Sequence, residues 1–435
     1  MISPGAKGWI NKYFDLVDNG HVVLKVNRPK GLRKLHFMHL TFSSCGIVFG
    51  FPLELIFAKN LDDSEWTKEE KLKLLLFEAH LFVFLQINKG RPFDREDFMA
   101  TLYKFYEHHN ASAIKKLFTF FLKESREEKI EGILSKRVDI KVKLLENKWW
   151  INSLSNTFSY LDVILFDDFI HKEKDKALTR YSTYAENALT AITLSAYSDG
   201  VIEEREVAIF NVFLASANLS DDERDEAKTR FQDGASLEDF SFFVRNHWLF
   251  KRFVLDVSIL TILSSNEMVD GEIEFLKKLC DYLEIPQVEL EENLGMIENF
   301  LLKTQNEVEF MQDSPSYEKV YSSLSKRWTK VLSRNKDKLA AELKESKELI
   351  SLVKKSATHE LTPAEKEAVK TQFKDIAKSI PTLTVFMLPG GTILLPLLLK
   401  IIPDLVPSAF KENIIDKDRP THLEDKTDRS IRSND

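Results

Sequence analysis

Apolar side chains in the middle of the chain recur at the three- and four-residue spacing of amphipathic helices. The pattern becomes regular at Thr67, which forms with Glu70 the sequence signature of a capping box. The run LLLFEAHLFVFL that follows is broadly apolar, which predicts a helix buried in a core. Further helices are predicted in the segments DREDFMATLYKFYEHH, ASAIKKLFTFFLKES and NKWWINSLSNTFSYLDVILFDDFI. The predicted fold class is mainly α.

The region before Thr67 is less regular. Its segment GHVVLKVN is compatible with a strand, and HLTFSSCGIVFGFPLELIFA is apolar over about twenty residues. Pro52, Glu54 and two glycines interrupt the second segment. This interruption favours a buried piece of the core over a membrane span.

A faint internal repeat consists of an apolar helix, an acidic turn and a second helix that opens with Glu. Three segments fit it: LFVFLQINKGRPFDREDFMATLYKFY, AITLSAYSDGVIEEREVAIFNVFLAS and SILTILSSNEMVDGEIEFLKKLCDYL. The equivalent positions are Gly90, Gly200 and Asn266 in the turns and, six residues later in each case, Glu96, Glu206 and Glu272. The first segment is the weakest match, because it has Lys89 where the second has Asp199.

Near the C-terminus, Thr362, Pro363 and Glu365 combine an N-cap, a proline at the first helical position and a capping-box glutamate. Four lysines then recur at four-residue spacing and form a Lys stripe: Lys366, Lys370, Lys374 and Lys378. Near an anionic leaflet each lysine contributes on the order of 1 kcal/mol to binding. The alternative is a solvated helix face whose lysines pair with nearby carboxylates.

The Lys stripe leads into the most apolar stretch of the chain, IPTLTVFMLPGGTILLPLLLKIIPDLVPSAF at 380–410, which is long enough to cross a bilayer. Prolines recur in it every seven residues, and each removes a backbone donor. A kinked span, a re-entrant hairpin and a core hairpin of a soluble domain all stay open. The candidate membrane-binding residues are the four lysines of the stripe together with Pro389, Gly390, Gly391, Pro396, Lys400 and Pro403.

The composition supports several folded domains, with 435 residues, 43% hydrophobic and 30% charged side chains. A net charge of −7 argues against nucleic acid as a direct partner. Cys45 and Cys280 lie in apolar surroundings, which suits buried thiols in a reducing compartment. The N-terminal sequence lacks the pattern of a secretory signal, so we expect the bulk of the chain in the cytoplasm.

Motifs that carry chemistry are missing from the sequence. It contains no Gly-rich phosphate loop, nucleophile elbow, HExxH or CxxC pair. His108 and His109 are adjacent, and neighbours on a helix point in different directions, so they make a poor metal site. We therefore expect a protein that is not an enzyme.

The region from Leu361 to Phe410 resembles the membrane-anchoring core of the leucine zipper, EF-hand-containing transmembrane (LETM) family. The resemblance rests on LTPAEKEAVKTQFKDI, the ordered prolines, Lys400 and IIPDLVPSAF. It implies an inner-membrane location, a role in cation/proton homeostasis and contact with the ribosome. The family carries an acidic residue after the central proline, where this chain has Gly390, Gly391 and Thr392. Because intramembrane carboxylates are the usual ion handles, this departure favours an anchor over an ion pathway.

The region from Tyr184 to Phe300 resembles a tellurite-resistance TerB-like helical domain, through ALTAITLSAYSDGVIEEREVAIFNVFLASANLSDDE and, more loosely, VSILTILSSNEMVDGEIEFLKKLCDYLEIP. The resemblance implies a divalent-cation site, for calcium or magnesium, at Asp199, Glu203, Glu206, Asp270 and Glu272. The second half has Ser265 where the first has Asp199, and no EF-hand loop occurs. The alternative is that the glutamates are helix-start residues favoured by the dipole and by capping.

Together the two resemblances match the bacterial LETM-related biofilm-associated proteins. The predicted organisation is a helical region that includes a degenerate TerB-like half (1–180), a TerB-like domain (181–300), polar connecting helices (301–357), a LETM-like membrane-associated segment (358–412) and a disordered tail (413–435). We expect a non-enzymatic, membrane-associated scaffold or sensor on the cytoplasmic face of the inner membrane, in envelope stress or biofilm formation, with a protein partner or divalent cation on its helical domains. The alternatives are a component of cation/proton homeostasis and a soluble TerB-like stress-response protein.

Overall fold

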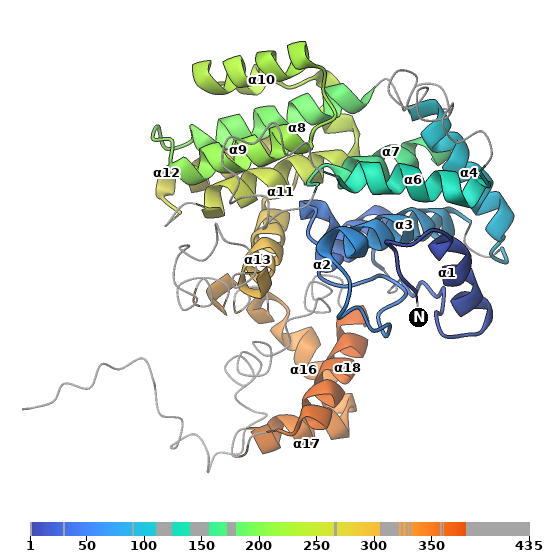
Figure 1. Cartoon of the computed structure of the whole chain (residues 1–435). Coiled ribbons are helices and arrows are strands. Elements are labelled where there is room, and N and C mark those ends of the chain that lie inside the picture. Colours follow the sequence, from blue (N-terminus) through green and yellow to red (C-terminus); the bar gives the residue numbers. More distant parts are fainter. Residues whose placement is uncertain are drawn as a thin grey trace, which may run out of the picture.

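The computed structural model describes residues 2–28, 31–88, 91–109, 124–139, 156–171, 180–264, 268–304, 332–356, 359 and 361–379, together with 322, 325–327 and 329. Every regular element among these residues is a helix (Figure 1), which confirms the mainly α fold. The segment 380–435 lies outside the described residues, as does most of the helix predicted in ASAIKKLFTFFLKES.

The N-terminal group of helices surrounds α3. It consists of α1 (Trp9–Asp18), α2 (Lys34–Cys45), α3 (Lys68–Ile87), α4 (Arg95–His109), α6 (Arg126–Val138) and α7 (Ser159–His171). Helix α3 packs against α4, α6 and α7, and its side chains are buried on nearly every side. The predicted capping box is present, with the Glu70 N–H donating to Thr67 Oγ1 over 3.2 Å and the Thr67 N–H donating to the Glu70 carboxylate over 2.9 Å.

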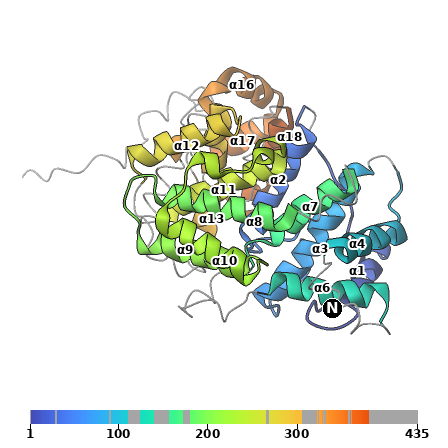
Figure 2. The same cartoon turned by 90° about the horizontal axis from the view of Figure 1, so that it is seen from above.

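The second group is built around the pair α8 and α11. It consists of α8 (Tyr181–Ala196), α9 (Glu204–Ser216), α10 (Asp221–Asp233), α11 (Trp248–Ser264), α12 (Asp270–Tyr282) and α13 (Gln287–Thr304). Helices α9 and α10 pack on α8, whereas α12 and α13 pack on α11. Seen from above, α2 and α7 lie between this group and the helices α1, α3, α4 and α6 (Figure 2).

Three further helices precede the apolar C-terminal segment: α16 (Lys336–Glu345), α17 (Lys347–Ser356) and α18 (Pro363–Ser379). They pack on one another through a small set of buried apolar side chains, Leu339, Leu343, Leu349, Val353, Leu361, Val369, Phe373 and Ile376. Arg327 contacts α13 nearby, with ion pairs of 2.9 Å to Glu298 and 3.0 Å to Glu291.

The strand interpretation of GHVVLKVN is wrong. Residues 22–28 have neither helix nor strand geometry, and the Lys25 N–H donates to the carbonyl of Val23 within the segment. A strand needs a neighbouring strand for its backbone groups, and the described part of the chain contains none. The alternation of side chains still has a role, because Val22 is buried while Val23 is exposed.

The apolar stretch after His39 is a piece of the core, as predicted. Helix α2 ends at Cys45, and a short helical turn, η1 (Ile47–Phe49), follows with every side chain buried. Gly46 and Gly50 bracket this turn with positive φ, and a Cβ atom at Gly50 would lie 2.4 Å from the Asn156 carbonyl oxygen. Cys45 is buried and free, and so is Cys280 on α12.

A buried carboxylate on α3 fixes the loop that follows η1. Glu78 is fully buried and accepts hydrogen bonds from the N–H groups of residues 56, 57 and 58 over 2.5 to 3.0 Å and from the Tyr13 hydroxyl over 2.8 Å. Burial raises the pKa of Glu78, and these donors oppose the rise by stabilising the anion. The loop and α1 are thus held to α3 by one side chain.

Replacing this carboxylate by an amide tests the arrangement. We expect Glu78→Gln to lower the free energy of unfolding by about 1–3 kcal/mol, because the amide NH2 would face a backbone donor and leave it unsatisfied. Urea unfolding followed by circular dichroism measures the change. Glu69→Gln on the exposed face of α3 is the matched control. Equal stabilities of the two variants would contradict the role of Glu78.

Candidate functional site: the acidic turns and the C-terminal helix

The two acidic turns of the repeat lie beside each other at the starts of α9 and α12. A Cβ atom at Gly271 would lie only 3.6 Å from the carbonyl oxygen of Ser198, so the turn before α9 touches the first turn of α12. Glu206 and Glu272 occupy equivalent places in the two helices and are 3% and 2% exposed. The structure therefore brings together residues that the repeat placed in register.

Each of these glutamates caps its own helix. A carboxylate oxygen of Glu206 accepts the Glu203 N–H over 2.9 Å, and one of Glu272 accepts the Val269 N–H over 2.7 Å. Asp199 closes its own turn by accepting the Val201 N–H over 2.9 Å. Glu206 and Glu272 therefore accept backbone hydrogen bonds at the starts of their helices.

The first segment of the repeat departs from this arrangement. Glu96 on α4 is exposed and pairs with Arg126 over 3.1 Å. At the start of α4 the Asp94 carboxylate accepts a hydrogen bond instead, from the Asp97 N–H over 3.1 Å. The equivalence of the capping glutamates thus holds for the second and third segments and fails for the first.

Carboxylates crowd around Glu206. Burial raises the pKa of Glu206 to about 7, the hydrogen bond from the Glu203 N–H opposes the rise, and the charges of Asp199, Glu203 and Glu272 add to it. Glu206 is therefore a buried carboxyl that gains its proton near neutral pH, at the point where the two turns meet.

Among the residues that the structure describes, no group of three or more His, Cys, Asp or Glu side chains is placed to hold a metal ion. Asp270 is exposed at the first position of α12, and Ser265 lies outside the described residues. The predicted cation site at Asp199, Glu203, Glu206, Asp270 and Glu272 stays a prediction.

Helix α18 begins where the sequence predicts. The Glu365 N–H donates to Thr362 Oγ1 over 3.3 Å, and the Thr362 N–H donates back to the Glu365 carboxylate over 3.0 Å. A hydrogen bond from Lys355 is the largest of the effects that lower the pKa of Glu365 to about 2. The start of α18 is thereby tied to the end of α17.

Among the side chains of α18 that the structure describes, Val369, Phe373 and Ile376 are buried, and the helix packs against α16 and α17. The Lys stripe runs along other backbone positions of α18 than the buried residues. Successive lysines are four residues apart, so each is displaced by roughly 40° around the helix from the one before it. The lysine side chains themselves are outside the described set, and so are all atoms of Pro389, Gly390, Gly391, Pro396, Lys400 and Pro403.

None of the helices in the described part of the chain is long and apolar enough to cross a membrane, and residues 380–410 lie outside that part.

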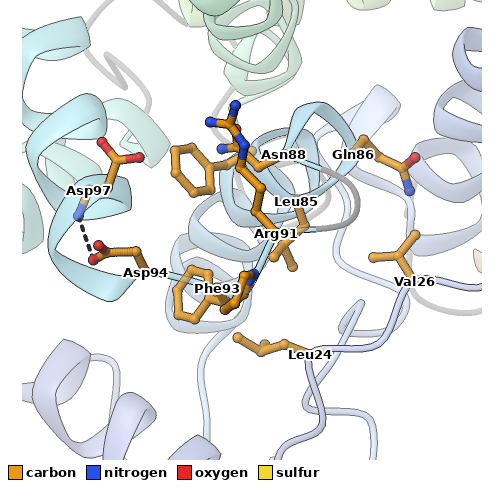
Figure 3. A pocket seen from close by; sticks show the side chains of 11 residues that line it. Leu24, Val26, Leu85, Gln86, Asn88, Arg91, Phe93, Asp94 and Asp97 are labelled. Carbon is orange, nitrogen blue, oxygen red and sulfur yellow. Dashed lines mark hydrogen bonds between the residues drawn. The ribbon is translucent and has the colours of Figure 1, made fainter.

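The described part of the helical body also contains cavities away from these turns. One, of about 390 Å³, lies between the loop before α2, the end of α3 and the start of α4, and its lining includes Leu24, Arg91, Phe93, Asp94 and Asp97 (Figure 3). The second, of about 230 Å³, is lined by residues that include Lys34, Asp167, Asp168, His171 and His247. Sequence reasoning missed both, because their linings come from segments far apart in the chain and share no motif.

Comparison with protein families supports the C-terminal resemblance. Residues 361–432 match the family model described as LETM1-like, RBD. This part of the chain is therefore similar to LETM1-like proteins. The chain matches no curated protein and no solved structure. The TerB-like domain and the link to biofilm formation stay predictions.

The acidic turns give a test through pH. In the unfolded chain Glu206 ionises near pH 4.3, whereas in the folded protein it stays protonated up to about pH 7, so stability is lost as pH rises through this window. Glu206→Gln can keep the capping bond without titrating. We expect urea unfolding to show that the wild type loses roughly 1–3 kcal/mol relative to this variant between about pH 5 and pH 8.

Glu204→Gln, an exposed neighbour in the first turn of α9, controls for the change in net charge. An identical pH dependence of the wild type and Glu206→Gln would contradict a raised pKa at this site.

Proposed function

We propose that the chain is a non-enzymatic, membrane-associated scaffold or sensor, in which a LETM-related C-terminal segment attaches a helical body to the cytoplasmic face of a bacterial inner membrane. The observation that carries the proposal is the family match at 361–432, which covers the apolar segment and the helix that leads into it. Composition and the missing catalytic motifs support the non-enzymatic part.

The arrangement of α16, α17 and α18 supports attachment. Its last helix is fixed at its start by the Thr362–Glu365 capping box and along its length by the buried stripe of Val369, Phe373 and Ile376. The apolar segment therefore follows from a packed helix and not from a loose linker. The Lys stripe lies on the same helix, where it would meet anionic headgroups first.

Two short histidine–carboxylate pairs in the described residues are unsuited to acid–base catalysis. His39 Nε2 lies 2.7 Å from Asp256, and each side chain is 1% exposed. His247 Nε2 lies 2.9 Å from Asp168, and its other ring nitrogen accepts a backbone N–H. A general base must reach its substrate, whereas both histidines are buried, His39 at 1% and His247 at 8% exposed.

We further propose that the helical body binds a protein partner or a divalent cation, with the ribosome as the partner that the family resemblance suggests. The acidic turns are the surface for the cation, since they bring carboxylates from α9 and α12 together. Envelope stress or growth as a biofilm is the setting in which such a scaffold or sensor would act.

Cell fractionation tests the attachment. We expect the full-length chain to sediment with membranes through high-salt and alkaline washes, because apolar contacts with lipid survive both treatments. A chain that ends at residue 379 keeps α18 and its buried stripe but lacks the apolar segment, and we expect it in the soluble fraction. A chain that ends at residue 358 removes the Lys stripe as well and should also be soluble.

A third variant, with all four lysines of the stripe replaced by Gln, separates charge from apolar attachment. Retention of this variant through the high-salt wash would assign the attachment to the apolar segment, whereas its appearance in the soluble fraction before any wash would show that the lysines are needed as well. The proposal fails when the full-length chain and the chain ending at residue 379 are equally soluble.

A further inference from the structure

Helix α11 is capped by a histidine. His247 precedes α11, and its backbone carbonyl accepts the Lys251 N–H over 2.9 Å, as an N-cap residue does. Its ring Nδ1 accepts the N–H of Phe250, three residues on, over 3.1 Å. The imidazole thus fills the place that a Ser, Thr, Asp or Asn oxygen usually takes.

The hydrogen bonds fix the protonation of this ring. A backbone N–H can only donate, so Nδ1 carries no proton, and Nε2 must carry the proton that is donated to Asp168 over 2.9 Å. His247 and Asp168 are 8% and 3% exposed. The folded cap therefore requires the neutral imidazole in one tautomer.

A protonated imidazole cannot make the cap. Both ring nitrogens would then donate, and the Nδ1–H would point at the Phe250 N–H. The ring must turn away or the first turn of α11 must open. Helix α11 packs on α8, α12 and α13 as well as on α2, so the start of a central helix depends on the protonation of one side chain.

Charged groups from several elements surround this ring. Asp168 on α7 is approached by the Tyr184 hydroxyl of α8 over 3.3 Å and by Arg180 over 3.9 Å. Lys34 of α2 contacts His171 of α7 over 3.0 Å at the cavity of about 230 Å³ that His247 also lines. The carboxylate of Asp167 lies 3.2 Å from His171.

On α11 itself, Lys251 donates to the carbonyl oxygens of Leu283 and Glu284, and Arg252 pairs with Glu289. Nearby, Nε2 of His36 on α2 lies 3.5 Å from a carboxylate oxygen of Glu292 on α13. Histidines paired with carboxylates therefore recur where α2, α7, α11 and α13 meet.

We propose that His247 is an acid-sensitive helix cap, which holds the start of α11 while its ring is neutral and releases it, together with the contact to α7, when the ring is protonated. The inference goes beyond membrane attachment and does not depend on it. It gives the helical body a physical means of responding to cytoplasmic acidification.

Two neighbouring groups, His36 and Glu292, also change protonation with pH. The pH dependence of the free energy of unfolding therefore does not isolate the His247 cap. Burial is the largest of the causes that lower the pKa of His36 to about 4. The stability that neutral His36 contributes to the fold is therefore lost as pH falls below the usual pKa of 6.5. Burial raises the pKa of Glu292 to about 7. The stability that protonated Glu292 contributes to the fold is therefore lost as pH rises from about 4.3 towards 7. The two effects have opposite signs, and a local measurement at α11, compared between the wild type and a variant with a non-titrating cap, separates them from the cap.

Hydrogen exchange of the full-length protein at about pH 7.5 and pH 5.5, corrected for intrinsic exchange rates, provides that measurement. We expect protection of the amides at 248–252 to fall by roughly five- to thirtyfold at the lower pH, the loss that one N-cap hydrogen bond is worth. His247→Asn places Oδ1 where Nδ1 stands and accepts at both pH values, so its protection should not change. The starts of α3 and α10, capped by Thr67 and Ser220, are internal controls.

A second variant, His247→Ser, supplies a hydroxyl cap in case the asparagine variant does not fold. Unchanged protection at the start of α11 in the wild type would overturn the proposal. An equal loss of protection in the wild type and in a folded variant with a non-titrating cap would also overturn it, because the loss would then come from another group.

Discussion

The helical body depends on one buried carboxylate that joins its two groups of helices. Asp256 on α11 is 1% exposed and accepts hydrogen bonds from His39 on α2 and from Asn293 on α13, each over 2.7 Å. Removing one partner of such a buried group leaves a charge unsatisfied and costs on the order of 3–5 kcal/mol. Since His39 and Asp256 are 217 positions apart, this contact fixes how α2 lies against α11 and α13.

The contact of Asp256 with His39 and Asn293 lies close to the start of α11. The ring of Trp248, the first residue of α11, is tilted against the ring of His36 and lies edge-to-face with that of His39, and the His247 cap precedes it directly. Helix α13 leaves the same junction and is held further along by Arg327. The histidine cap therefore lies directly beside the junction of α2, α11 and α13.

The sequence predicts the local features well, because capping and helical periodicity depend on residues close in the chain. The capping boxes at Thr67 and Thr362 and the register of Glu206 with Glu272 follow from spacing alone. The strand interpretation of GHVVLKVN, residues 20–27, was wrong, since alternation of side chains cannot show that a partner strand is missing. The role of His247 was not predictable, because its tautomer depends on Asp168 in another helix.

Flotation of the purified full-length protein with lipid vesicles tests the central claim most directly, since no other cellular component is present. The account predicts that the protein floats with vesicles rich in anionic lipid and stays bound when salt is raised, because the apolar segment at 380–410 holds it. Recovery of the protein at the bottom of the gradient with every vesicle composition, by a preparation that is folded and monodisperse, would contradict attachment through the LETM-related segment.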